Sequence, residues 1–359
     1  MLSENKKFFL SLVRLGIGHT SDLINKKIKW NEIDALAAEQ GLTAIVLDGI
    51  EKIPETLRPP QDVMLQWIGE VFQSYEYQYK AYQHAHAELA AFHREHHLKM
   101  MVLKGYGCSL NWPRPEHRPC GDIDIWQFGQ QKKADGILEK EKGIKVDNGE
   151  HHHTVFYWGD FMVENHYDII MPTAVKSNKA IEPVLKELAM DDTYFIEVEG
   201  EKVYLPSPNL NALFLLRHML MHFVAVGVSI RNLLDWGFFW EKHGKDVDLN
   251  WLNDLLKKYN MRDFFNIINA ICVEDLGFVS GNFPTIRYDA FLKDRVLKEI
   301  LEPEYDKKEA HHPKPIKRLV FKYKRWKGGK WKRELCFKES TLSSFLWSVR
   351  SHLLKPRTI

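Results

Sequence analysis

The sequence predicts an α+β protein in which a mixed β-sheet core is flanked by N-terminal helices and a C-terminal helical domain. Three observations predict this class: helical spacing of apolar residues in the N-terminal quarter, period-two alternation with glycine turns in the middle, and helical spacing again after Ser207-Pro208. We therefore divide the chain into four parts. They are an N-terminal helical region (1–98), an α/β core (99–206), a helical domain (207–300) and a basic, aromatic-rich C-terminal tail (301–359).

The composition excludes several protein classes. With 359 residues and 45% hydrophobic content, the chain is long enough to bury a sizeable core. It contains no apolar run of the roughly 18–20 residues that a membrane-spanning helix needs, and the short apolar patch Phe8–Val13 lacks the cleavage site of a secretory signal. The four scattered cysteines form no CxxC pair, which excludes a zinc knuckle or disulfide framework and favours a reducing, cytoplasmic location.

The formal net charge of +2 conceals a basic segment. Residues 314–333 contain ten Lys or Arg and no acid, so the rest of the chain carries −8. Three interpretations stay open: a solvated helical tail, a nucleic-acid patch that stacks bases on Trp326 and Trp331, or a membrane-surface segment that adds Phe337 and Trp347. The Gly328-Gly329 pair predicts that the segment is not one continuous helix.

The sequence of the N-terminal region predicts helices. Trp30–Gln40 has apolar residues at helical spacing and is followed by Gly41, a typical C-terminal cap. The stretch from Val63 to Leu98 has no proline and predicts one long helix or two joined end to end. After Ser207-Pro208, which predicts a helix start, helices are expected to about Leu276 with breaks at Gly227 and Gly244.

The middle of the chain alternates strands with tight turns. We expect strands where short apolar or alternating runs are bounded by glycines, and a surface helix where charged residues prevail. The predicted strands are Lys99–Leu103, a strand holding Ile123 and Ile125, a hairpin of Thr154–Trp158 with Phe161–Ile170 around Gly159-Asp160, and a pair at Phe195–Val198 and Val203–Leu205; the predicted helix is Lys132–Lys142.

Paired acids mark the candidate site. Asp122 and Asp124 occupy positions i and i+2 of one strand, so their carboxylates project to the same face. Two like charges so placed are best tolerated when a divalent cation lies between them. The hairpin strand supplies candidates for a third ligand in Glu164, His166 and Asp168, which are expected to face the same way.

A glycine turn precedes these acids. Gly105 and Gly107 allow backbone amides to approach an anion, and Lys104 adds a positive charge suited to a triphosphate. A phosphate-binding turn followed by paired carboxylates is the arrangement that nucleotidyl transfer needs.

These segments resemble the polymerase-beta-like nucleotidyltransferase superfamily and, more closely, its uncharacterised bacterial nucleotidyltransferase family. The matching motifs are L-K-G at Leu103–Gly105, R-x-x-G-D-I-D at Arg118–Asp124 and acid-x-His-aromatic at Glu164–Tyr167. The resemblance covers roughly residues 5–280 and reaches into the helical domain, where His218-x-x-x-His222 is followed by Arg231 and Leu234-Asp235.

The resemblance implies a nucleotidyltransferase-like sheet and a role for each matching residue. Asp122, Asp124 and Glu164 would be the catalytic carboxylates and the ligands of Mg²⁺ or Mn²⁺, with Asp168 as an alternative third acid. The nucleotide-binding residues would be Lys104, Gly105, Gly107, Ser109 and Arg118. The substrates would be an NTP such as ATP and a hydroxyl acceptor on a protein, a tRNA, a sugar or a small metabolite. The chain departs from the pattern at Tyr106, where the superfamily has Gly or Ser, and at Cys108.

Two other function classes remain open on sequence grounds. One is a catalytically inactive binding module with the same fold, and the other is a nucleic-acid-binding protein acting through the basic tail. The run His151–His153 favours a solvent-facing or substrate-edge loop over a zinc site, although hairpin pairing would bring His153 near the carboxylates. His218 and His222 lack a third ligand, which favours helix packing or a nucleotide pocket, and Arg231 and Asp235 are expected to form a pair.

Overall fold

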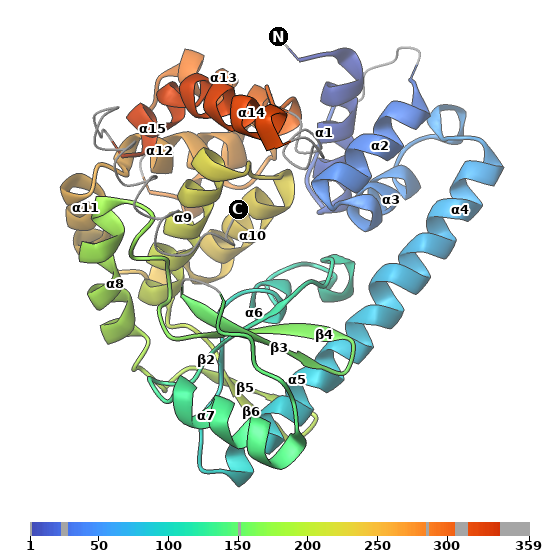
Figure 1. The fold of residues 1–359 in the computed structure, drawn as a ribbon. Helices are drawn as coiled ribbons and strands as arrows, with labels where there is room; N and C mark the ends of the chain where they lie inside the picture. The colour runs from blue at the N-terminus through green and yellow to red at the C-terminus, as the bar shows by residue number, and fades with distance from the viewer. Residues whose placement is uncertain (1, 23–27, 150–151, 285–286, 306–314, 338–359) are drawn as a thin grey trace. The chain divides into compact units, whose positions relative to one another are not determined.

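The computed structural model describes residues 2–22, 28–149, 152–284, 287–305 and 315–337, and Figure 1 shows its fold. The chain divides into two compact units. The first, which we call the helical unit, comprises Met1–Ile68 and Leu216–Thr341. The second, the sheet unit, comprises Gly69–Leu215 together with Leu342–Ile359, which lie outside the described residues. The predicted α/β core of 99–206 falls inside the sheet unit.

The N-terminal part of the helical unit confirms the helix predicted from the spacing of its apolar residues. That helix, α2, spans Trp30–Gln40, and Gly41 ends it with φ of 66° while the Leu42 N–H donates to the Ala37 carbonyl at 2.8 Å. The helices of this part are α1 (Glu4–Gly16), α2 (Trp30–Gln40), α3 (Thr43–Glu51), the 3₁₀ turn η1 (Glu55–Leu57) and α4 (Gln61–Val71).

Helices return after Ser207, as predicted. The Leu210 N–H donates to the Ser207 hydroxyl at 3.4 Å at the start of α9, and Gly227 follows the end of this helix. Helices also extend beyond the predicted limit near Leu276. They are α9 (Pro208–Ala225), α10 (Ile230–His243), η5 (Gly244–Asp246), α11 (Leu249–Lys258), α12 (Arg262–Ala270), η6 (Ile271–Asp275), η7 (Ser280–Asn282), α13 (Ala290–Leu301), α14 (Pro315–Gly328) and α15 (Lys330–Cys336).

The sheet unit is built on a mixed sheet of six strands in the order β3-β4-β2-β1-β6-β5. The pairs β2–β4 and β1–β6 are parallel, and β1–β2, β3–β4 and β5–β6 are antiparallel. The strands are β1 (Met101–Val102), β2 (Ile123–Trp126), β3 (His153–Trp158), β4 (Phe161–His166), β5 (Phe195–Val198) and β6 (Glu201–Tyr204). The unit's helices include α5 (Gln78–Glu95), α6 (Tyr106–Ser109), η3 (Pro115–His117), α7 (Gln131–Ile137), η4 (Leu138–Lys142) and α8 (Lys176–Leu188).

The two faces of β2 have different neighbours. Ile123 and Ile125 are fully buried in one hydrophobic cluster with Leu89 and Phe92 of α5, so this helix covers that face of the sheet. The intervening residue Asp124 must point to the opposite face, because side chains alternate along a strand. All four residues of β2 are buried, so the charge of Asp124 lies in the interior rather than at the exposed face of an amphipathic strand.

Both predicted hairpins are present. Gly159-Asp160 joins β3 to β4, and their pairing aligns His153 with His166 and Val155 with Glu164. The second hairpin turns at Glu199-Gly200 with positive φ at both residues, the form expected of a two-residue turn between twisted antiparallel strands.

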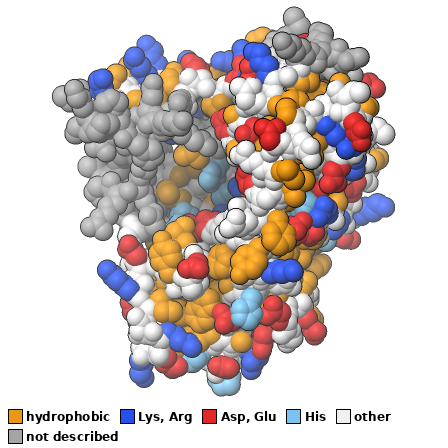
Figure 2. Space-filling view, turned by 90° about the vertical axis from the view of Figure 1, so that its right-hand side faces the viewer, with side chains coloured by type: hydrophobic (Ala, Val, Ile, Leu, Met, Phe, Trp, Pro, Cys, Tyr) orange, Lys and Arg blue, Asp and Glu red, His pale blue; other side chains and the backbone are white. Residues whose placement is uncertain are grey.

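The long stretch from Val63 to Leu98 forms helices joined end to end. A π-helical segment, η2 (Phe72–Tyr77), connects α4 to α5 without a break. Apolar side chains stand exposed on α4 and η2: Leu65, Ile68, Phe72 and Tyr77. In the space-filling view from the side where α4 stands in Figure 1, hydrophobic side chains lie among charged ones (Figure 2). No helix among the described residues combines the length and apolarity that a bilayer crossing requires.

A tight turn links β1 to α6 and carries the predicted phosphate-binding residues. Gly105 has φ of 55° and ψ of −108°, a conformation that residues with a Cβ rarely adopt. A Cβ at Gly105 would also lie 2.3 Å from the hydroxyl of Tyr82, which is buried and donates to the Asp122 carbonyl at 2.8 Å. The glycine is therefore required for the path of the backbone.

Replacing this glycine tests that requirement. Gly105→Ala is expected to lower the free energy of unfolding by about 1–3 kcal/mol, because it adds backbone strain and a steric contact. Gly121→Ala is the matched control, since a Cβ at Gly121 meets nothing within 4 Å. Urea unfolding followed by circular dichroism measures both, and equal stability of the two variants would contradict the strained turn.

Candidate functional site

Two carboxylates meet on neighbouring parallel strands of the sheet unit. Asp124 of β2 is in register with Glu164 of β4, so both side chains project to the face opposite α5. Asp124 is only 1% exposed and Glu164 is half-buried. The strand pairing therefore concentrates negative charge at a position shielded from water.

Two basic side chains hold the buried carboxylate of Asp124. The Lys104 Nζ lies 2.9 Å and the His166 Nε2 3.1 Å from Asp124 Oδ1. Burial alone would raise the pKa of Asp124, but Lys104 and His166 outweigh it and hold this pKa well below its usual range. In turn, although burial lowers the pKa of Lys104, the neighbouring carboxylates raise it above its ordinary value.

Glu164 has basic neighbours, but none as close as those of Asp124. Burial first, and the negative charges of Asp124 and Asp122 second, raise the pKa of Glu164 from 4.5 to about 8. The His166 Nε2 is 3.7 Å from Glu164 Oε2, farther than it is from Asp124. Glu164 is thus placed to gain from an additional cation at this face of the sheet.

Asp122 lies beside the group of side chains that could bind a metal ion and is not a member of it. Among the described residues, Asp124, Glu164 and His166 offer ligand atoms that all lie within 4.8 Å of one another. Asp122 immediately precedes β2 and is half-buried, and its charge contributes to the raised pKa values of both Glu164 and Lys104. Its carboxylate is therefore close enough to act on the site electrostatically.

Asp168, the alternative third acid, is engaged elsewhere. Its carboxylate forms an ion pair with Lys186 of α8, and its main-chain carbonyl accepts a hydrogen bond from His166 Nδ1 at 3.1 Å. Strand β4 ends at His166, so the alternation that predicted a common face does not extend to Asp168. The structure thus brings Glu164, and not Asp168, together with Asp124.

Two further histidines approach the carboxylates. As the hairpin pairing predicted, His153 lies near Glu164, with its Nδ1 3.6 Å from Glu164 Oε2. The interpretation of this run as a solvent-facing loop is wrong for His152 and His153, since the first is half-buried and the second is buried at the start of β3. Burial, and then the neighbouring histidines, hold the pKa of His152 well below its usual value. His151 lies outside the described residues.

The remaining predicted nucleotide-binding residues have protein partners. Ser109 is 2% exposed, and its hydroxyl donates to the Tyr106 carbonyl at 2.7 Å and lies 3.2 Å from the Tyr79 hydroxyl. Arg118 is buried, and its guanidinium donates to the Pro119 carbonyl at 3.4 Å. A phosphate that binds to Ser109 would have to replace one of these contacts.

Tyr106, the departure from the superfamily pattern, is a core residue. It is 3% exposed, and its ring centroid lies 4.8 Å from that of His86 and 5.8 Å from that of Tyr79. Gly107 lies one residue further along α6, where a Cβ would approach Leu205 to 3.3 Å. The aromatic ring thus fills the hydrophobic cluster of the sheet, and the Gly107 N–H of the turn donates to the Lys104 carbonyl at 3.0 Å.

Sequence reasoning missed a polar network behind the carboxylates. Asp135 of α7 accepts hydrogen bonds from Asn165 Nδ2 at 2.8 Å and from the Thr154 hydroxyl at 2.9 Å, all three residues being buried. Asn165 lies between Glu164 and His166 on β4, so the network anchors the strand from its other face. The sequence signal for this network was that residues 164, 165 and 166 are all polar.

Trp331 of the basic tail packs within the helical unit. Trp331 lies against Phe223 with 5.7 Å between ring centroids, and the Arg295 guanidinium is 4.0 Å from its ring. Lys332 forms an ion pair with Glu299 at 2.6 Å. The predicted break is confirmed, since α14 ends at Gly328 and α15 begins at Lys330. Base stacking on Trp331 would compete with these contacts; Trp347 lies outside the described residues.

The role of His218 and His222 in helix packing or in a nucleotide pocket stays a prediction. The His218 and His222 rings stack along α9 with 4.2 Å between centroids, as expected of positions i and i+4. Asp235 of α10 is buried. The expected pair of Arg231 with Asp235 likewise stays a prediction.

Comparison with known proteins identifies one family. Residues 26–277 match the model of a family described as "Uncharacterised nucleotidyltransferase". The matched span includes Lys104, Asp122, Asp124, Glu164 and the histidines beside them. Neither the curated proteins nor the solved structures yield a match to this chain.

The raised pKa of Glu164 predicts how stability responds to pH. Because Glu164 ionises near pH 8 when folded and near 4.5 otherwise, its stabilising contribution is present below pH 4.5 and is lost as pH rises through about 8. Glu164→Gln removes this loss. In chelator-treated protein, the fall in melting temperature between about pH 6 and about pH 9 should therefore be smaller for the variant than for the wild type.

The control for this measurement is Glu197→Gln, the same change at an exposed position of β5. It should melt with the wild-type pH dependence. A Glu164→Gln variant that also kept the full wild-type dependence would show that Glu164 ionises normally.

Proposed function

The chain belongs to the uncharacterised nucleotidyltransferase family, and we propose that it transfers an NMP from an NTP to a hydroxyl acceptor with release of pyrophosphate. The observation that carries the proposal is the register of Asp124 with Glu164, beside Lys104. This arrangement joins one buried and one half-buried carboxylate to a lysine in the glycine turn after β1. A nucleoside triphosphate with its divalent ion has the complementary charges.

We assign Asp122, Asp124 and Glu164 as the ligands of Mg²⁺ or Mn²⁺. Carboxylate oxygens suit these ions, and the raised pKa of Glu164 marks an excess of negative charge that a divalent ion would neutralise. When bound, such an ion supplies charge neutralisation on the triphosphate. The observed hydrogen bonds leave Glu164 without a close basic partner comparable to those of Asp124, which fits this ligand set.

Lys104 has two negative partners available to it in this proposal. Without nucleotide it pairs with Asp124 at 2.9 Å. Once the charge of Asp124 is neutralised by a bound divalent ion, the Lys104 ammonium becomes available to bind a phosphate oxygen of the substrate. That oxygen would lie next to the backbone amides that follow Gly105. Lys104 would therefore orient the triphosphate and stabilise the departing pyrophosphate.

Glu164 is suited to take the proton in the transfer. The acceptor hydroxyl oxygen forms a bond to the α-phosphorus, the bond from that phosphorus to the bridging oxygen breaks, and pyrophosphate leaves with the electron pair. The hydroxyl proton passes to the Glu164 carboxylate, which is half-buried on the same face of the sheet as Asp124.

The inactive binding module and the nucleic-acid-binding tail remain competing proposals. The packing of Trp331 within the helical unit favours a structural role for that ring.

Label transfer tests the reaction. The wild-type protein, incubated with Mg²⁺ or Mn²⁺, α-phosphate-labelled NTPs and a cell lysate, is expected to label one class of acceptor. Asp124→Asn should reduce the rate by at least about 10²-fold, because it removes a charge worth several kcal/mol in the transition state. Asp160→Asn in the exposed β3–β4 turn is the matched control and should retain the rate.

Calorimetry with each NTP separates the alternatives. Nucleotide binding without label transfer would indicate the binding module, and label transfer unaffected by Asp124→Asn would contradict the assigned site.

A further inference from the structure

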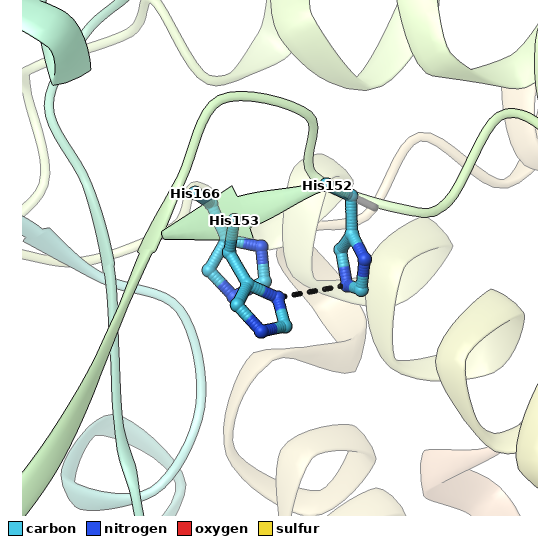
Figure 3. A group of neighbouring side chains, drawn as sticks. All are labelled: His152, His153 and His166. Carbon is cyan, nitrogen blue, oxygen red and sulfur yellow. Dashed lines mark hydrogen bonds between the residues drawn. The ribbon is translucent and has the colours of Figure 1, made fainter. Parts of the chain in front are cut away.

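Three imidazoles gather beside the carboxylates. His152 and His153 enter β3, and His166 ends β4 on the adjacent strand of the same hairpin (Figure 3). Each offers a ring nitrogen, and these atoms all lie within 4.8 Å of one another. The ring centroids are 4.4 Å apart for His152 and His153, 5.2 Å for His153 and His166, and 5.3 Å for His152 and His166.

One ring nitrogen in this group has no protein partner. The Nδ1 of His152 is shielded from solvent and makes no hydrogen bond within the described part of the chain. Its Nε2 lies 3.3 Å from His153 Nδ1, so one histidine donates to the other. The Nε2 of His152 is therefore the nitrogen that faces the other two rings, and Nδ1 lies on the far side of its own ring (Figure 3).

His166 is oriented as a metal ligand. Its Nδ1 donates to the Asp168 carbonyl at 3.1 Å, and its Nε2, which lies 3.1 Å from Asp124 Oδ1, would give up its proton to a metal ion bound there. Metal-binding histidines commonly donate their second ring N–H to a carbonyl or carboxylate, which fixes the ring and its tautomer. The ion pair of Asp168 with Lys186 holds the residue that supplies this carbonyl.

A fourth donor is near the histidines. Glu164 Oε2 lies 3.6 Å from His153 Nδ1 and 3.7 Å from His166 Nε2. Three imidazoles and one carboxylate oxygen are a complete ligand set for a four-coordinate zinc ion. Imidazole favours ions such as Zn²⁺, whereas Mg²⁺ prefers oxygen ligands and retains its waters.

We propose that His152, His153 and His166, with Glu164 as the fourth donor, form a binding site for a divalent transition-metal ion of the Zn²⁺ type. This nitrogen site is additional to the oxygen ligands assigned for nucleotidyl transfer, and its occupation does not require that reaction. Glu164 belongs to both ligand sets and His166 also contacts Asp124, so an ion at the histidines would lie next to the nucleotide-binding carboxylates.

Zinc binding by the full-length protein tests this site. Chelator-treated protein is titrated with Zn²⁺ against a chromophoric chelator in the presence of excess Mg²⁺. We expect one tightly held Zn²⁺ per chain that Mg²⁺ does not displace. His152→Ala and His153→Ala should each weaken zinc binding by at least about 10²-fold. His84→Ala, an exposed histidine of α5, is the control and should bind zinc as the wild type does.

X-ray absorption at the zinc edge gives a readout that needs no variant. Scattering from imidazole rings is expected in the loaded wild-type protein, whereas a shell of oxygen ligands alone would overturn the proposal. Unchanged zinc affinity in both histidine variants, or displacement of zinc by Mg²⁺, would overturn it as well. Circular dichroism of each variant confirms that a loss of affinity is not a loss of fold.

The Asp124→Asn variant separates this inference from the proposed function. It should keep one Zn²⁺ per chain while nucleotidyl transfer is lost. Zinc bound by the histidines in a protein that labels no acceptor would contradict only the transferase. Label transfer in a wild-type protein without the zinc site would contradict only the inference made here.

Discussion

The burial of one negative charge is the constraint on which the site depends. Asp124 lies in the interior of the sheet unit, where an unpaired carboxylate would be costly, and Lys104 and His166 stabilise it from two sides. These partners come from the turn after β1 and the end of β4, so one carboxylate fixes three segments of the chain relative to one another. The positive φ of Gly105, the residue after Lys104, belongs to the turn that carries this lysine.

Much of the fold follows from local sequence signals. The cap at Gly41, the start at Ser207-Pro208 and both hairpins were predictable, because each depends on residues within a few positions of one another. The choice between Glu164 and Asp168 was not, since it depends on where β4 ends and how it pairs with β2. Strand register is set by long-range packing, which period-two alternation alone does not determine.

The histidines show where a residue-type argument fails. A run of His beside a turn resembles a solvated loop in composition, yet His152 is half-buried and His153 is buried, because β3 begins there and pairs with the end of β4. Trp331 is a second case in which composition left several interpretations open: a tryptophan in a basic segment can form a stacking surface, and the structure shows Phe223 and Arg295 in contact with its ring. In both cases the deciding contacts come from residues distant in sequence.

The β3–β4 hairpin has a consequence for how such proteins diversify. His153, His166 and Glu164 belong to this single hairpin and His152 immediately precedes it, whereas Lys104 lies in the turn after β1 and Asp124 on β2. The imidazoles and the lysine–aspartate pair are thereby carried by separate stretches of chain, which the pairing of β2 with β4 brings together. Exchange of this hairpin between relatives would replace the nitrogen donors while leaving the lysine–aspartate pair in place.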